Sequence, residues 1–290
     1  MLQTMILTIA VIPLALGVVA ALVANAAGSR KAAAIAFLIP LFASAILIGI
    51  DGWPAFPPVR AAHKVPYVLA IGAVVFAVAA LSVRKAHAGL TALAAAIAIA
   101  LPAWWLGRNI LANNSQKATV VAVLFVIAVV GVAWQALRRN TSAEMAQAQV
   151  LPQALFATSV AGAIVAILGG YMGMAMFNGA LAALAGGFLL VTYIRYLRGD
   201  ENAFRLPGGG ALAFAWVAFA GVLVTAISAP KASSAALVAT ALTPALTPLA
   251  ALYGPRMAHA PRALLPLITG LIAAVPALAG ILIASLHFAG

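Results

Sequence analysis

The chain has 290 residues, of which 66% are hydrophobic and only 7% are charged, and its formal net charge is +12. A soluble domain carries about 25% charged residues, so a chain this apolar cannot cover its surface with polar groups and needs lipid as its solvent. The sequence contains no Cys, which excludes disulfides, thiolate metal sites and cysteine nucleophiles.

Ten apolar runs follow one another along the chain, each close to the length of a membrane-spanning helix, which is about 20 residues. The runs do not alternate between polar and apolar residues, as the strands of a membrane β-barrel would. We therefore predict an all-α polytopic membrane helix bundle with about ten transmembrane helices. In chain order the runs cover 3–26, 32–50, 66–82, 89–106, 118–137, 150–170, 173–196, 211–229, 234–252 and 264–287.

Basic residues concentrate in every second connection between these runs. The connections after the odd-numbered runs hold eleven of the sixteen Lys and Arg residues. The positive-inside rule therefore predicts that these connections face the cytoplasm and that both termini lie outside it, in a cell inner (cytoplasmic) membrane. Such scattered cations are typical of helix flanks that meet lipid headgroups, so the bilayer is the predicted partner and nucleic acid is not.

The chain divides into two halves of five runs each. Residues 1–139 form the first half, residues 140–149 a polar cytoplasmic linker, and residues 150–290 the second half. An odd number of spans in each copy of a repeat makes the two copies inverted, so the layout predicts two inverted five-helix repeats. The loops that begin at Asp51 and Asp200 echo each other, each with Ala-Phe and then Pro. Shared loop chemistry is the alternative explanation for this echo.

The polar residues give no sign of catalysis. No set of acids could hold magnesium on a diphosphate, no pair of His could ligate a haem, and no Ser-His-Asp set can be assembled. The sequence therefore predicts no enzyme, no cofactor and no metal site. The four acids lie in connections, at Asp51, Glu144, Asp200 and Glu201.

Interrupted helices are the strongest candidate for a binding site. Each Pro inside a helix removes a backbone hydrogen bond, and a neighbouring Thr hydroxyl can satisfy a freed carbonyl. Broken helices in mid-membrane expose polar backbone, which is how many transporters build an uncharged site. A simple structural kink is the alternative. The candidate residues are Thr243, Pro244, Thr247 and Pro248 in the ninth run, with Pro40 and Pro102 in the second and fourth.

Two further features are candidates. Residues 169–179 combine small residues, three Met and Asn178, which is one of the few amides inside an apolar run. This combination suits an adaptable apolar site or, alternatively, close helix packing. The outer loop 51–66 is stiffened by prolines and carries aromatic and cationic side chains. It is expected to cap a cavity, dock a partner or lie in the membrane interface. Its candidate residues are Trp53, Phe56, Arg60 and His63.

The size of the chain and its five-plus-five layout resemble those of small metabolite permeases of the drug/metabolite transporter kind. This resemblance implies a permease fold, although the predicted outside N-terminus departs from the placement usual in that group. Two functions follow as expectations. The first is a permease or flippase for a neutral, amphipathic or weakly anionic small molecule. The second is a non-catalytic membrane subunit or scaffold of a larger complex, with other membrane subunits as partners.

Overall fold

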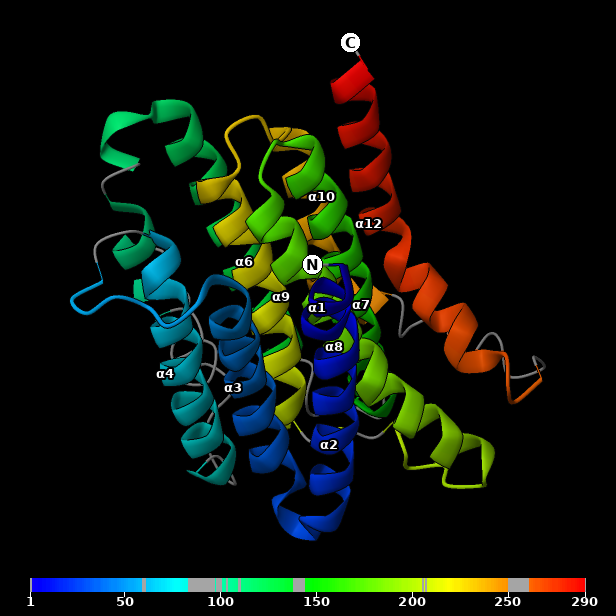
Figure 1. The fold of residues 1–290 in the computed structure, drawn as a ribbon. Helices are drawn as coiled ribbons and strands as arrows, with labels where there is room; N and C mark the ends of the chain where they lie inside the picture. The colour runs from blue at the N-terminus through cyan, green and yellow to red at the C-terminus, as the bar shows by residue number, and fades with distance from the viewer. Residues whose placement is uncertain are drawn as a thin grey trace.

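The computed structural model describes residues 2–58, 61–82, 97, 101–102, 104–108, 111–137, 144–204, 206, 208–249 and 261–289 (Figure 1). All regular structure in these ranges is helical. A π-helix η1 (Leu7–Val11) joins α1 (Leu2–Ile6) to α2 (Ile12–Ala26), and a 3₁₀ turn η2 (Gly28–Arg30) leads into α3 (Lys31–Asp51). The other helices are α4 (Ala61–Ser82), α6 (Ser115–Leu137), α7 (Glu144–Leu168), α8 (Met172–Leu197), α9 (Gly208–Ser228), α10 (Ser234–Ala245) and α12 (Leu265–Ala289).

Six helical segments are long and apolar enough to cross a membrane: Gln3–Ala26, Lys31–Asp51, Val150–Leu168, Met172–Leu197, Gly210–Ser228 and Leu265–Ala289. These six segments confirm the prediction of an α-helical membrane bundle. Three shorter apolar helices, His63–Val78, Ser115–Gly131 and Ser234–Ala245, coincide with further predicted runs. Most of the predicted fourth run, 89–106, lies outside the described residues.

Helix α9 is the centre of the bundle. Its apolar segment is 94% buried, against 28% for α12 and 22% for the segment that contains α2. It packs against α3, α4, α6, α7 and α10, while α12 lies at one edge of the bundle (Figure 1). Phe214 and Trp216 anchor it through ring contacts to Phe188 on α8 and Phe76 on α4. A helix that is apolar on all sides belongs in the interior of a membrane bundle, and α9 fits that rule.

The helix pairs of the two halves differ. An inverted repeat would make α3 and α4 equivalent to α8 and α9. The pair α3–α4 packs along much of its length, whereas α8 and α9 touch only slightly. Similarly, α7 packs against α9, but their counterparts α2 and α4 are not close neighbours. The packing of the described helices therefore does not support the predicted inverted repeat.

Candidate functional site

A groove of about 390 Å³ opens on the side of the bundle between α12 and the α7–α8 pair. This volume lies within the range of about 300–1,000 Å³ that is usual for ligand sites. The groove exists because α12 packs against α7 and α10 but is not a close neighbour of α8. Its walls are almost entirely apolar and include Phe156, Val160, Leu189, Leu271 and Leu278.

The end of this groove near the start of α12 is polar. Gln153 on α7 donates from Nε2 to the carbonyl of Pro266 at 2.7 Å, while its buried Oε1 has no hydrogen-bond partner among the described residues. Pro266 fits the first turn of α12, where its missing N–H has no helical acceptor to lose. Tyr193 on α8 donates its hydroxyl to the carbonyl of Ala263 at 2.8 Å. Gly270 leaves the room that the Gln153 amide occupies, because a Cβ there would lie 3.1 Å from Cδ of Gln153.

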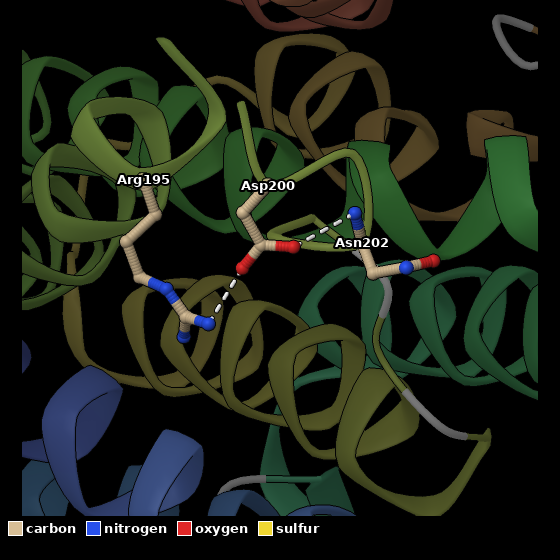
Figure 2. Close-up of polar contacts among 3 residues, drawn as sticks. All are labelled: Arg195, Asp200 and Asn202. Carbon is tan, nitrogen blue, oxygen red and sulfur yellow. Dashed lines mark hydrogen bonds and ion pairs between the residues drawn. The ribbon is translucent and has the colours of Figure 1, made fainter. Parts of the chain in front are cut away.

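Charged side chains gather at this same end of the bundle. Arg195, in the last turn of α8, forms an ion pair with Asp200, and Asp200 also accepts the backbone N–H of Asn202 at 3.0 Å (Figure 2). This is the only ion pair within the described residues. It is partly exposed and contributes little stability, but it fixes the turn between α8 and α9. The guanidinium of Arg262 lies over the ring of Tyr196, 4.9 Å from its centroid.

A second hollow lies in the centre of the bundle, between α4, α6, α9 and α10. Its volume is about 30 Å³, which holds a water molecule but not a metabolite. Pro102 from the predicted fourth run and Ala241 from α10 both line it. Next to this cavity, Lys64 is 6% exposed and donates to the carbonyl of Trp105 at 2.9 Å, with its ammonium 5.5 Å from the Trp105 ring centroid. The neighbouring groove of about 390 Å³ between α4 and the predicted fourth run also includes Pro102 and is apolar.

The predicted interruption of the ninth run is confirmed, because α10 ends at Ala245 between the two Thr-Pro pairs. All four residues of these pairs are buried. The hydroxyl of Thr247 donates to the carbonyl of Pro244 at 3.0 Å, as a residue beside a proline break is expected to do. The hydroxyl of Thr243 has no hydrogen-bond partner among the described residues. Pro40 is buried inside α3. Because α3 is not a close neighbour of α10, the structure does not bring Pro40 together with the α10 break.

Asn178 lies in the wall between α7, α8 and α9. Its amide nitrogen donates to the carbonyl of Met174 at 2.8 Å and to the hydroxyl of Thr225 at 3.0 Å. Cβ atoms at Gly162 on α7 or Gly221 on α9 would lie 2.9 Å and 2.7 Å from its Oδ1, so both glycines make room for the amide. These contacts fit the packing alternative for this residue.

The loop 51–66 and the start of α4 hold both exposed and buried side-chain groups. Trp53 and Phe56 are 84% and 87% exposed, as an interfacial or docking role requires. His63, at the start of α4, keeps Nδ1 buried with no hydrogen-bond partner among the described residues. Arg60 lies outside the described residues.

No group of three or more His, Asp or Glu side chains that could hold a metal occurs in the part of the chain that the structure describes. Comparison of the chain with models of protein families, with curated proteins and with solved structures finds no match. The resemblance of its layout to metabolite permeases therefore remains a prediction.

The sequence prediction did not include the groove residues Gln153 and Tyr193, nor Arg262, which lies over the nearby ring of Tyr196. One signal was available, because Gln153 is an amide near the start of an apolar run. Its significance depends on the position of α12, more than 110 residues later in the chain, as the separation of 113 between Gln153 and Pro266 shows.

Proposed function

We propose that this chain is a permease or flippase for an amphipathic, neutral or weakly anionic small molecule, acting in the cell inner (cytoplasmic) membrane. The observation that carries the proposal is the lateral groove between α7, α8 and α12. It is long and apolar, it reaches a polar end at Gln153 and Tyr193, and it opens to the side. An amphiphile in the bilayer could lie there with its tail along α12 and its headgroup at the polar end.

Reconstitution tests this function directly. Vesicles that contain the purified protein and a fluorescently labelled amphiphile are treated with a membrane-impermeant quencher. We expect the protein to make inner-leaflet label accessible, since the groove gives the headgroup a polar contact at membrane depth. Vesicles without protein provide the background. If neutral, zwitterionic and anionic labels all stay protected, the permease proposal is contradicted.

We further propose ten spans. Ser44 on α3 reaches Pro66 on α4, so these helices are antiparallel, and Gly210 at the start of α9 meets Ile35 near the start of α3. Helix α4 therefore runs opposite to α9. Helix α6 also runs opposite to α9, because Lys117 near its start donates to the carbonyl of Ile227 near the end of α9 at 3.0 Å. Two consecutive helices that run the same way need a return crossing, which the 89–106 run would supply.

The proposed orientation has both termini outside the cytoplasm. Basic residues from two odd-numbered connections share one end of the bundle, where Lys31 interacts electrostatically with Arg195. We expect alkaline phosphatase fused after Gly290 to be active, because it matures only outside the cytoplasm, and a fused green fluorescent protein to be dark. The opposite pair of signals would place the C-terminus in the cytoplasm. It would then contradict either the proposed orientation or the proposal of an even number of spans.

A specific observation favours the second candidate, a non-catalytic subunit or scaffold. Thr243 and Thr247 are 0% and 1% exposed, and the central cavity holds no more than a water-sized molecule. A scaffold needs no solvated path through its centre and keeps the Thr-Pro segment dry. Purification that always carries a stoichiometric partner, together with failure of the vesicle assay, would establish this alternative.

A further inference from the structure

The polar end of the lateral groove offers hydrogen-bond acceptors. Gln153 donates one of its two amide N–H groups to the carbonyl of Pro266, and its buried Oε1 has no hydrogen-bond partner among the described residues. Tyr193 spends its hydroxyl hydrogen on Ala263, which leaves the lone pairs of its oxygen. A buried acceptor without a donor is unfavourable, so a ligand that brings a donor to Gln153 is favoured.

The rim of this end offers a positive charge. Arg262 precedes α12 by one turn and stacks on Tyr196, whose ring also meets Phe204, a residue of the groove wall. Arg262 is exposed and takes part in no ion pair with the described residues. Stacking on an aromatic ring leaves the guanidinium edge free for a bidentate contact with a phosphate.

The remainder of the groove fits an acyl chain. Leu267, Leu271 and Leu278 line it from one face of α12, and Phe156 and Val160 face them from α7. In a bilayer these side chains gain nothing by meeting another apolar protein surface rather than lipid, so the filling of the groove depends on shape and on the polar end. Donors and an anion at one end, with a hydrocarbon chain behind them, describe a lipid.

We propose that the groove selectively binds a membrane lipid whose headgroup joins an anionic phosphate to hydroxyl groups. The inference rests on the proposed function, because it names the class of amphiphile that the same site takes. Arg262 contacts the phosphate, a headgroup hydroxyl donates to Oε1 of Gln153, and the acyl chain follows α12. By the proposed orientation this end faces the cytoplasmic leaflet, where anionic lipids are attracted to basic flanks.

Native mass spectrometry of the full-length protein tests the selectivity. The protein is released from mixed micelles with equal amounts of phosphatidylglycerol, which has the phosphate and two hydroxyls, and phosphatidylcholine, which has no donor. We expect phosphatidylglycerol to be retained on the order of tenfold more, a ratio that corresponds to about 1.4 kcal/mol. Gln153→Leu and Arg262→Gln should each reduce this ratio toward one.

Matched variants provide the controls. Arg198→Gln removes an exposed cation from the end of α8, and Gln116→Leu removes an exposed amide from α6. Both should keep the wild-type ratio. Equal retention of the two lipids by the wild type overturns the inference, and so does equal loss of selectivity in Arg198→Gln and Arg262→Gln, which would reveal only general charge attraction. Selective binding with no lipid movement in vesicles would instead remove the proposed function and leave the inference standing.

Discussion

Replacing Gly187 with Ala is expected to destabilise the fold severely. Gly187 on α8 and Gly17 on α2 form a contact in which two helix backbones touch, and a Cβ at Gly187 would overlap the carbonyl oxygen of Leu14. A backbone carbonyl cannot rotate away as a side chain can, so the helices must separate. Overpacking of a core destabilises a protein by about 1–3 kcal/mol where side chains can adjust. Because the backbone cannot adjust here, we expect Gly187→Ala to lower the free energy of unfolding by about 3 kcal/mol or more. Thermal unfolding in detergent measures the loss.

The adjacent glycine is the control. A Cβ at Gly186 would lie 3.7 Å from the ring of Phe156, which is an ordinary van der Waals contact. Gly186→Ala should therefore fold as well as the wild type, or slightly better, because Ala is favoured over Gly in a helix by about 1 kcal/mol. Equal melting temperatures for the two variants would mean that α2 and α8 are not packed through these glycines.

The positions of the helices could be predicted because the bilayer imposes a simple rule on composition. A run of apolar residues bounded by charges must be a helix of about 20 residues, and the predicted run 173–196 accordingly corresponds to α8, which is Met172–Leu197. The rule fails where backbone chemistry intervenes. The predicted run 234–252 gives α10 only as far as Ala245, because Pro244 and Pro248 remove the hydrogen bonds that would continue the helix.

The arrangement of the helices could not be predicted in the same way. In lipid, apolar side chains have little preference for protein over solvent, so hydropathy does not say which face of a helix meets which neighbour. The five-plus-five count suggested symmetric halves, but small residues such as Gly17 and Gly187 set the contacts and do so differently in each half. The groove depends on the same detail, since α12 packs on α7 through Gly270 and Gln153.

The same reasoning explains why the predicted site and the candidate groove differ. The sequence predicted a site at Thr243 and Thr247, because a proline inside an apolar run can be recognised from the sequence alone. The structure buries both side chains, and the first makes no hydrogen bond to the described residues. The groove is lined by ordinary Leu, Phe and Val residues that have no distinctive pattern. The unpartnered acceptor of Gln153, at the polar end of the groove, marks it as more than a packing gap.

Filling the groove should slow transport strongly without unfolding the protein. Leu271 on α12 lines the groove and is 63% exposed, so Leu271→Trp places a large ring where the substrate tail would lie. The ring has open space on its lipid side, and the helix contacts of α12 with α7 and α10 are not touched. We expect the rate of movement of labelled amphiphile in vesicles to fall by roughly tenfold or more, equivalent to at least about 1.4 kcal/mol in the barrier.

Leu282→Trp makes the same substitution on the same helix at a residue that is 60% exposed and is not part of the groove wall. This variant should insert, fold and transport as the wild type does, since only lipid meets the new ring. A comparable loss of rate in both variants would mean that a bulky residue on α12 disturbs the membrane or the helix itself. Full activity in Leu271→Trp would mean that the substrate does not pass along this groove, and the polar end at Gln153 would then need another explanation.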